Sequence, residues 1–410
     1  MKKIAIIIPG VLPMPAVKGG AVENLVMNLI KENEINKKYK FVVYSPFDDN
    51  AILESNNYKE TEYIYVKDSY ISKFLDKIIF IIAKKILKKE DSQKYRYIIK
   101  RINYLYSVSK KLKKNDYDLI ILENHPSEYL ALKWHNNYKK YEGKYIYHSH
   151  NTFASLYNCN EIISKTKKFI CVSEYISNYT QKIISCEKEK CIVLRNCINQ
   201  SEFSKQLTTN EIIELRKELK INEDDKVIIF TGRLIKEKGI QELISALKNI
   251  NNPKIKLLVI GSSTFNMKVK TQFEEDLYNS INDFKDRIIF TGFVNYENIY
   301  KYYKIADLAV IPSIWDDPAP LTIIESLTCG LPIITTNSGG IPEYVNDECA
   351  IILDKNKDLV YNLSLAIQDV LFSEKIVEMR KKSENAAKGL DVINYYKNFV
   401  NIIEENEDEK

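Results

Sequence analysis

The chain has 410 residues, of which 45% are hydrophobic and 28% charged, and its formal net charge at pH 7 is +5. This composition is typical of a soluble globular protein and excludes a disordered or fibrous one. The length predicts about two domains. The mild net charge does not indicate a nucleic-acid partner, and no apolar run reaches the length of a membrane span.

The seven cysteines are odd in number, and no two of them form C-x-x-C. This usage favours reduced thiols in a cytoplasmic protein over disulfides or a zinc site. The chain begins with a short apolar run that Pro9 and Gly10 interrupt. The run is too short for the hydrophobic region of a signal peptide, so we expect a buried strand there.

Short apolar runs of strand length alternate with amphipathic segments. The first series covers residues 4–9, 41–45, 119–124, 145–149 and 169–173. The rhythm restarts after about residue 205, with runs at 227–232, 256–262, 288–293, 308–313 and 332–336. Strands rich in Ile and Val on both faces, separated by helices, predict a parallel sheet covered on both sides. Two such series predict an α/β protein with two doubly wound domains.

A polar stretch at 196–205 marks the expected domain boundary. We expect one domain at 1–203, a second at 204–375, and a last segment at 376–410 whose helix crosses back to the first domain. The acidic end of that segment, "EENEDEK", is predicted to be a disordered tail.

Ligands of doubly wound sheets bind at the carboxyl ends of the strands, where loops lead into helices. The first strand is followed by "PGVLPMPAVKGGAVE", in which Gly19 and Gly20 precede an expected helix. Glycines at this point let backbone N–H groups approach a phosphate or a sugar. The spacing is not G-x-G-x-x-G, and an ordinary strand-to-helix turn explains the pair equally well.

Residues 70–115 carry 14 Lys or Arg and three acids. Apolar residues recur at helical spacing beside lysines: Leu75, Ile79, Ile82 and Ile86 beside Lys84, Lys85, Lys88 and Lys89. A basic amphipathic helix lies on an anionic lipid leaflet, and we therefore expect peripheral contact with a membrane. A helix that packs on the core and solvates a lysine face explains the pattern nearly as well.

Polar residues end the third and fourth strands of the first series. Glu123 and His125 follow one strand, and His148 and His150 end the next. Because the carboxyl ends of parallel strands share one edge, we expect these side chains on the ligand side of the first sheet. A lone histidine is more often structural than catalytic, and the pattern alone assigns these residues no role.

The strand at 227–232 ends in "TGRLIKEKG". Gly232 allows the turn, and Arg233 and Lys238 lie just beyond the strand. A guanidinium and an ammonium at this edge suit a diphosphate, although two solvated surface cations are an equal alternative for this motif alone.

The strand at 308–313 leads into "IWDDPAPLTIIESLTCG". Asp317 lies in the loop, Pro320 suits the first turn of a helix, and Glu325 lies within that helix. The N–H groups of Leu321 and Thr322 open toward the same edge of the sheet. Such a loop has the parts needed to bind hydroxyls and phosphates.

These motifs, in this order, resemble the retaining glycosyltransferases of family 4, which have the GT-B fold and include bacterial polysaccharide and lipid-linked glycan transferases. The resemblance covers nearly the whole chain. It rests on "KGGAVE", "YHSHNTF", "ICVSEYISNYT", "VLRNCIN", "TGRLIKEKGIQELISAL" and "PSIWDDPAPLTIIESLTCGLPIITTNSGGIPEYV". It implies a cytoplasmic enzyme in cell-surface polysaccharide synthesis, acting at the inner face of the cytoplasmic membrane. The implied reaction moves a hexose from a nucleotide-diphosphate sugar, a UDP-sugar, to a glycan or lipid-linked acceptor.

The resemblance also implies roles for the donor residues. Arg233 and Lys238 bind the diphosphate, Glu325 holds the ribose hydroxyls, and Asp317 lies beside the transferred sugar. Backbone groups near Val294 meet the nucleobase. The family commonly has Glu at the position of Asp317, and the following Pro318-Ala319-Pro320 stiffens the loop, so the contacts to the sugar are less well defined than those to the phosphates.

On the acceptor side, the resemblance implies one functional histidine. His150 aligns with it better than His148, and Glu123 and His125 are further candidates. No cofactor is implied. Since no D-x-D-type cluster occurs where a diphosphate-bound metal is expected, the predicted reaction is metal-independent.

Three other classes stay open. A glycoside hydrolase could use Asp317 and Glu325 as acid and nucleophile, but it would have no use for an Arg/Lys phosphate site. A sugar-nucleotide epimerase of the same fold would need no acceptor. A non-catalytic module that binds a sugar nucleotide is the third alternative.

Overall fold

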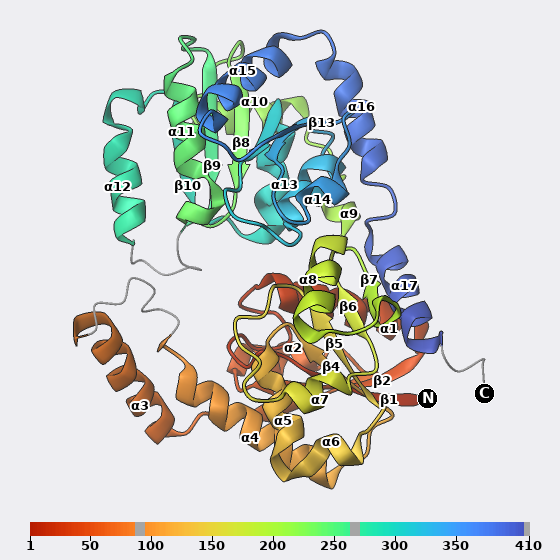
Figure 1. Ribbon diagram of the computed structural model, residues 1–410. Coiled ribbons are helices and arrows are strands. Elements are labelled where there is room, and N and C mark those ends of the chain that lie inside the picture. The colour runs from red at the N-terminus through yellow and green to blue at the C-terminus, as the bar shows by residue number, and fades with distance from the viewer. Residues whose placement is uncertain (87–94, 263–270, 406–410) are drawn as a thin grey trace. The chain divides into compact units, whose positions relative to one another are not determined.

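The computed structural model describes residues 1–86, 95–262 and 271–405 (Figure 1). The chain divides into two compact units, Met1–Asn196 with Val392–Lys410 as unit 1 and Cys197–Asp391 as unit 2. The sequence pattern places the boundaries at 203/204 and 375/376 instead. Two helices account for the difference, because α9 (Gln200–Phe203) and α16 (Ile376–Ala386) both belong to unit 2.

Unit 1 is built on a parallel sheet of seven strands in the order β3-β2-β1-β4-β5-β6-β7. The strands are β1 (Lys2–Ile7), β2 (Tyr39–Pro46), β3 (Thr61–Val66), β4 (Leu119–Glu123), β5 (Tyr145–Ser149), β6 (Phe169–Cys171) and β7 (Cys191–Val193). The sequence pattern misses β3 and β7. Strand β3 is half-exposed at the sheet edge, and β7 has three residues, so neither has the continuous apolar run of a central strand.

The helices of unit 1 begin with α1 (Ala21–Asn36), which follows β1. The others are α2 (Asp49–Ser55), α3 (Tyr70–Ile81), a π-helical turn (Ile82–Ile86), α4 (Ile98–Lys114), α5 (Tyr129–Lys133), α6 (Asn137–Lys140), α7 (Asn160–Ser164), α8 (Glu174–Ile184) and α17 (Val392–Glu404). The final helix α17 packs against α1, where the Tyr396 hydroxyl donates to Asn33 Oδ1 at 2.9 Å. The end of the chain is therefore part of unit 1.

Unit 2 has six parallel strands in the order β10-β9-β8-β11-β12-β13. They are β8 (Lys226–Thr231), β9 (Ile255–Ile260), β10 (Ile288–Gly292), β11 (Leu308–Ile311), β12 (Ile333–Thr336) and β13 (Ala350–Leu353). Its remaining helices are α10 (Thr209–Glu218), α11 (Ile240–Lys248), α12 (Gln272–Ser280), α13 (Tyr296–Lys304), α14 (Leu321–Thr328) and α15 (Leu359–Phe372). Of the six strands of unit 2, only β13 was not predicted from the sequence.

Both faces of the unit 2 sheet are buried. Along β9, Leu257 and Val259 join the cluster that α11 and α15 cover, while Leu258 and Ile260 join the cluster under α13 and α14. This alternation explains the unbroken apolar run of β9, since a strand covered on both sides has no solvent face to mark with polar residues. The predicted pair of doubly wound domains is confirmed.

The order of the strands reverses between β1 and β4 in unit 1 and between β8 and β11 in unit 2. Loops at such a point diverge to opposite faces of the sheet and leave room for a ligand at the carboxyl ends of the strands. In unit 2 these are the loops after β8 and β11, which carry the predicted donor residues. Among the described residues, no helix is both long enough and apolar enough to cross a membrane.

Candidate functional site

In unit 2, the loops after β8 and β11 are fastened to each other. The N–H of Ile314 donates to the carbonyl of Glu237 at 3.0 Å. Gly239 has a φ of 71°, and a Cβ added there would lie 1.8 Å from the carbonyl oxygen of Pro312. Only glycine allows this approach, and the glycine at the end of "KEKG" therefore holds the cation-bearing loop against the acidic one.

The loop after β12 completes this edge. The N–H of Gly340 donates to the carbonyl of Asp317 at 2.9 Å, and the Ser338 hydroxyl donates to the carbonyl of Ser313 at 2.8 Å. A Cβ on Gly339 would lie 2.4 Å from the Asp317 carbonyl oxygen. The "NSGG" segment therefore supports the backbone of the acidic loop, a role that the sequence did not suggest.

Lys238 and Asp317 form an ion pair through Nζ and Oδ2. The side chain of Lys238 is 20% exposed and that of Asp317 is 6% exposed, so the pair is largely shielded from solvent at the mouth of the loops. Arg233, on the same loop as Lys238, is exposed. The structure thus brings two predicted site residues into direct contact, although they lie 79 positions apart.

Glu325 lies on α14, the helix that follows the Asp317 loop, and is buried. The Tyr303 hydroxyl of α13 donates to its Oε2 at 2.8 Å. Burial raises the pKa of Glu325 to about 7, and the hydrogen bonds from Tyr303 and Tyr296 offset only part of this rise. The two tyrosines stand seven residues apart on one face of α13, and this spacing in "YENIYKYYK" is the signal that could have revealed them.

Helix α14 begins at Leu321, with Pro320 as its N-cap. Among the described residues, no side chain caps this end of the helix. The Ile323 N–H donates to the Pro320 carbonyl at 3.2 Å, while Leu321 and Thr322 form the first turn beside the Asp317 loop. The partial positive charge of a helix N-terminus favours an anion at this position.

Two further predicted donor residues lie at neighbouring strand ends. Gly232 follows β8, and a Cβ added to Gly261 after β9 would lie 1.9 Å from its carbonyl oxygen. Val294 lies two residues beyond β10 and packs on the apolar cluster under α13 and α14. The donor residues predicted in unit 2 therefore lie in the loops that follow β8, β10 and β11, or in α14.

In unit 1, Glu123, His148 and His150 form a buried cluster. Glu123 Oε2 lies 3.1 Å from His148 Nδ1 and 3.1 Å from His150 Nε2. Burial opposes the charged form of Glu123, but the two histidines outweigh it and lower its pKa to about 2. Burial lowers the pKa of His150 to about 4, helped by His148. At neutral pH Glu123 is therefore a carboxylate beside a neutral His150 imidazole, and both histidine rings lie within hydrogen-bond distance of it.

The same three residues are close enough together to form a metal centre. One ligand atom from each of its three residues lies within 4.8 Å of the others, and two histidines with one carboxylate are a familiar zinc-binding set. Each imidazole, however, already directs a nitrogen to Glu123 Oε2. Hydrogen bonding thus satisfies the carboxylate without an ion, and we assign no metal to it.

His125 is held by local structure. Its Nε2 contacts Arg101 Nη1 at 2.8 Å, and its Nδ1 lies 2.7 Å from Ser127 Oγ at the start of the short 3₁₀ turn Pro126–Glu128. Burial lowers its pKa to about 4, with Arg101 adding to the effect. These contacts favour a capping role for His125.

Gly19 and Gly20 lie in the β1–α1 loop of unit 1, and both have positive φ angles. Gly20 is the N-cap of α1, where a Cβ would lie 2.1 Å from Glu23 Oε2, while a Cβ on Gly19 would meet open space. Burial raises the pKa of Glu23 to about 7, and Glu123 adds to the rise. The role of the glycine pair toward the donor remains a prediction.

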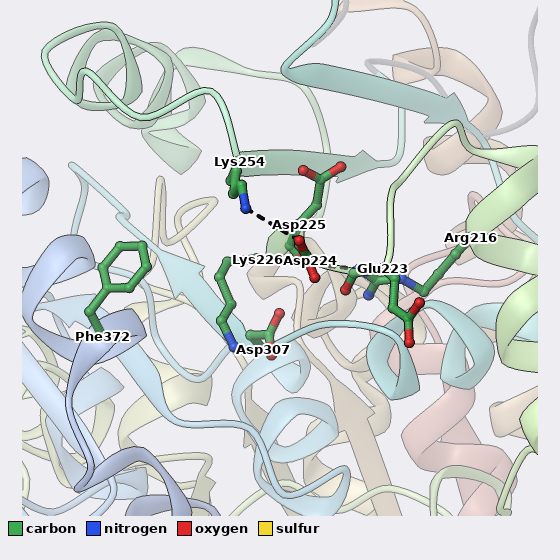
Figure 2. Close-up of a pocket in the computed structure, with 8 residues that line it drawn as sticks. All are labelled: Arg216, Glu223, Asp224, Asp225, Lys226, Lys254, Asp307 and Phe372. Atoms are coloured by element: carbon green, nitrogen blue, oxygen red, sulfur yellow. Dashed lines mark hydrogen bonds and ion pairs between the residues drawn. The ribbon is translucent and has the colours of Figure 1, made fainter.

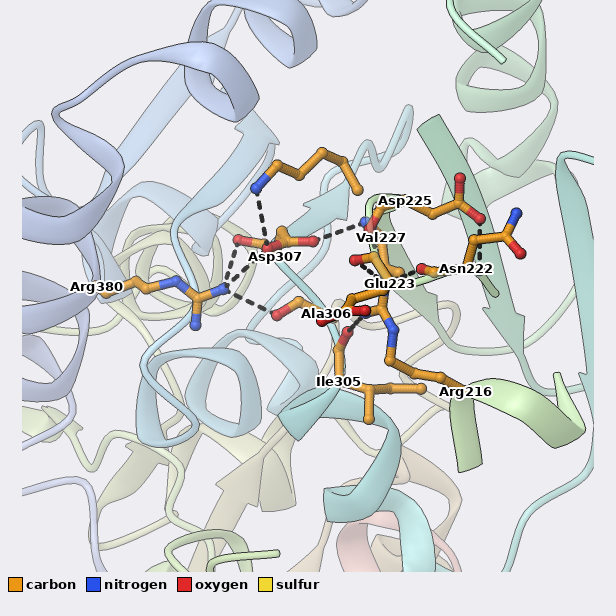
Figure 3. A network of polar contacts seen from close by, with 10 residues as sticks. Arg216, Asn222, Glu223, Asp225, Val227, Ile305, Ala306, Asp307 and Arg380 are labelled. Carbon is orange, nitrogen blue, oxygen red and sulfur yellow. Dashed lines mark hydrogen bonds and ion pairs between the residues drawn. The ribbon is translucent and has the colours of Figure 1, made fainter. Parts of the chain in front are cut away.

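Figure 2 shows a pocket of about 480 Å³ in unit 2, lined by Arg216, Glu223, Asp224, Asp225, Lys226, Lys254, Asp307 and Phe372. It lies at the amino ends of β8, β9 and β11, opposite the loops described above. Its charges serve the fold (Figure 3). Arg216 donates to the carbonyls of Asn222 and Asp225 at 2.6 and 2.8 Å, and Arg380 donates to that of Ala306 at 2.9 Å. We therefore place the candidate site elsewhere.

Comparison with known proteins gives a family model and several relatives. Residues 211–389 match the model described as glycosyl transferases group 1. An uncharacterized glycosyltransferase of Methanocaldococcus jannaschii is 29% identical over 62% of this chain and 69% of its own length. The lipopolysaccharide 1,2-N-acetylglucosaminetransferase of Salmonella typhimurium is 22% identical over 59% of this chain and 61% of its own length.

Among solved structures, Anabaena HepE in complex with UDP-glucose superimposes with a TM-score of 0.70 at 16% identity, covering 99% of this chain and 100% of that one. The two doubly wound sheets have the GT-B fold, as predicted. The fold, the matched model and the relatives together support a GT-B glycosyltransferase.

Proposed function

We propose that this chain is a retaining glycosyltransferase of family 4 that moves a hexose from a UDP-sugar to a glycan or lipid-linked acceptor during the synthesis of a cell-surface polysaccharide. One observation carries the proposal. Lys238 and Asp317 meet at the β8/β11 reversal point of unit 2, and the loop that carries Asp317 leads into α14, which carries the buried Glu325. The Salmonella relative acts in lipopolysaccharide synthesis by its name, and HepE was solved with UDP-glucose, which supports this choice of substrates.

The main catalytic demand is the charge that develops on the departing diphosphate. Lys238, Arg233 and the N-terminus of α14 are positioned to stabilise it, and preorganised positive groups of this kind are often the largest catalytic contribution. Asp317 holds the Lys238 ammonium in place and lies next to the transferred sugar. The Glu325 carboxyl accepts hydrogen bonds from the ribose hydroxyls, and Val294 lies near the nucleobase.

On the acceptor side, Glu123 orients His150. In the tautomer that donates Nε2–H to Glu123, Nδ1 keeps a lone pair and accepts a hydrogen bond from a sugar hydroxyl. We infer that His150, rather than His148, is the functional histidine. We also infer that the enzyme works in the cytoplasm, at the inner face of the membrane that holds a lipid-linked acceptor.

A panel of sugar nucleotides tests the proposal. We expect release of UDP from one UDP-sugar when an acceptor is present, with the anomeric configuration retained in the product. The rate should be the same with a chelator and with added Mg²⁺, because cationic side chains neutralise the diphosphate. Isomerised donor without UDP release would instead identify an epimerase, and binding without turnover would identify a non-catalytic module.

A further inference from the structure

Helix α3 of unit 1 turns its apolar stripe outward. Its exposed large apolar side chains recur at helical spacing and continue into the following π-helical turn. They are Tyr70 (91% exposed), Ile71 (70%), Phe74 (64%), Leu75 (40%), Ile78 (38%), Ile81 (40%) and Ile82 (40%). We call these seven residues the α3 apolar face. Contiguous exposed apolar surface of this kind marks an interaction site.

The inner side of the helix is polar where it meets the rest of unit 1. Ser72 is 1% exposed and Asp76 is 5% exposed. The Asp76 carboxylate accepts the N–H groups of Ile99 at 2.8 Å and Lys100 at 2.9 Å, which belong to the first turn of α4. A buried carboxylate that satisfies the free N–H groups of a helix start fixes the rotation of α3 about its axis.

Two interpretations were given for residues 70–115, contact with a membrane and packing on the core. The orientation of α3 favours the first. A helix that packs on the core would bury Leu75 and Ile82, yet both are exposed. Ile79 is partly buried. The side chain of Ile86, together with Lys88 and Lys89, lies outside the described residues. Helix α3 and the turn after it therefore have the reverse of a core-facing pattern, whereas α4 buries Leu105, Val108 and Leu112.

The apolar surface extends onto α4 and its preceding residue. Tyr97 is 36% exposed, Ile98 36%, Ile102 41% and Tyr106 43%. Helices α3 and α4 pack against each other. The exposed apolar side chains thus belong to a helical pair rather than to a single isolated helix.

The exposed charges of residues 70–86 all have one sign. Lys73, Lys77, Lys84 and Lys85 are exposed, and the single acid of this range is the buried Asp76. A second copy of the chain would bring these four lysines against four others in a symmetric contact. Anionic lipid head groups instead supply the opposite charge, while the acyl region accepts the apolar stripe.

We propose that the α3 apolar face and its four lysines dock unit 1 on an anionic lipid leaflet. The contact is peripheral, with the helix lying along the interface. Phe74, Ile78 and their neighbours enter the boundary between head groups and acyl chains, and the lysines meet lipid phosphates. The inference rests on α3 and not on the transferase reaction, and it would place the enzyme where a lipid-linked acceptor is found.

Sedimentation of the full chain with lipid vesicles tests the proposal without donor or turnover. We expect binding to vesicles of phosphatidylcholine mixed with phosphatidylglycerol, much weaker binding to phosphatidylcholine alone, and loss of affinity at high salt. Phe74→Ser with Ile78→Ser should lower the affinity at least about tenfold, because two bulky apolar groups no longer enter the interface. Lys73→Glu with Lys77→Glu should lower the affinity for the mixed vesicles and leave the weak binding to phosphatidylcholine alone unchanged.

Matched controls are Leu53→Ser on α2, which is 69% exposed, and Lys217→Glu on α10, which is also exposed. Both should bind as the unchanged chain does, and circular dichroism should show that all variants are folded. Failure of the unchanged chain to bind mixed vesicles overturns the proposal, as does unchanged binding by the folded Phe74/Ile78 variant. If the unchanged chain forms a dimer without lipid and the Phe74/Ile78 variant is a monomer, the face binds a second copy of the chain instead. Loss of UDP release with vesicle binding intact would count against the proposed function alone.

Discussion

At the scale of single residues, the Lys238–Asp317 ion pair joins a residue predicted to bind the diphosphate to one predicted to lie beside the transferred sugar. A buried or half-buried ion pair gains little net stability, because the loss of hydration offsets much of the attraction. Its presence at the mouth of the loops is better explained by positioning. In the proposed reaction, Asp317 keeps the flexible lysine at one place, so that its charge is already ordered when a diphosphate binds.

We predict that Lys238→Met lowers kcat by about 10²–10³ without unfolding the chain. Asp317→Asn should also lower kcat while leaving the affinity for UDP near that of the unchanged protein. Because the two residues act as a unit, the double variant should be little worse than Lys238→Met alone. Turnover of a suitable donor and calorimetric titration with UDP measure these effects.

Asp316→Asn is the control for this series, since the neighbouring Asp316 pairs with Lys355. It should turn over donor at nearly the unchanged rate. If Asp317→Asn does the same, Asp317 only orders the loop and its assignment to the sugar side is wrong.

Glu325 gives a second prediction, in which stability and function move in opposite directions. Its pKa is about 7 in the folded chain and near 4.5 when unfolded, so the folded state holds an extra proton between these values. Stability from this group is therefore lost as the pH rises from about 4.5 to 7. Glu325→Gln mimics the neutral form and should raise the free energy of unfolding at pH 8 by roughly 1–3 kcal/mol.

The same variant should bind UDP more weakly, because an amide accepts hydrogen bonds from ribose less well than a carboxylate. Chemical denaturation at pH 8 and pH 5 checks the first part, with little difference between the proteins expected at pH 5. Tighter or unchanged UDP binding by Glu325→Gln would remove the ribose assignment.

The residues of the candidate site were predicted from the sequence, but their contacts could not be. Motifs place Gly232, Arg233 and Asp317 in loops at strand ends, and they place Glu325 in the helix that follows the Asp317 loop. Tyr303 was missed because its seven-residue spacing from Tyr296 is one of several tyrosine spacings in α13, and none of them identifies Glu325 as the partner. The pairing of Lys238 with Asp317 was missed too, since it depends on two loops meeting in space.

At the scale of elements, central strands were predictable and helix rotation was not. Runs such as 227–232 and 308–313 are apolar on both faces, which only a covered parallel strand requires. Strand β3 lacks this signature, and the apolar runs of β7 and β13, with three and four residues, are too short to stand out. For α3, the periodicity shows that one side is apolar, but only the contact of Asp76 with the start of α4 shows that this side faces outward.

The strand ends β4 and β5 carry a prediction about acid stability. His150 has a folded pKa of about 4, below the usual 6.5, so the unfolded chain binds an extra proton between these values. Stability from this group is present above pH 6.5 and is lost as the pH falls toward 4. His150→Asn should therefore reduce the free energy of unfolding that is lost between pH 7 and pH 5 by roughly 1–2 kcal/mol.

Urea denaturation at the two pH values measures this change. His135→Asn is the control, because His135 is exposed and replacement there should leave the pH dependence as it is. An equally steep loss of stability in His150→Asn would show that His150 is not held neutral by burial.

At the scale of the whole molecule, the chain leaves unit 1 at residue 196 and returns to it at 392. Unit 2 is thus an insertion between the β-sheet of unit 1 and its last helix. Helix α17 buries Phe399 completely, with Tyr395, Tyr396 and Ile402 also buried. The carboxyl-terminal helix therefore belongs to the core of unit 1, although it follows unit 2 in sequence.

This topology predicts that damage to α17 destabilises unit 1 and leaves nucleotide binding by unit 2 in place. Phe399→Ala removes a fully buried ring and should lower the stability of unit 1 by about 3–5 kcal/mol. Ile393→Ala on the same helix is the control, because Ile393 is 66% exposed and its replacement should have little effect. Thermal unfolding with and without UDP separates the two units, since a ligand stabilises only the unit that binds it. For Phe399→Ala we expect an early transition that UDP does not shift, followed by a later one that it does. A single transition that UDP raises as a whole would mean that the two units unfold together, and the donor site would then depend on α17 as much as unit 1 does.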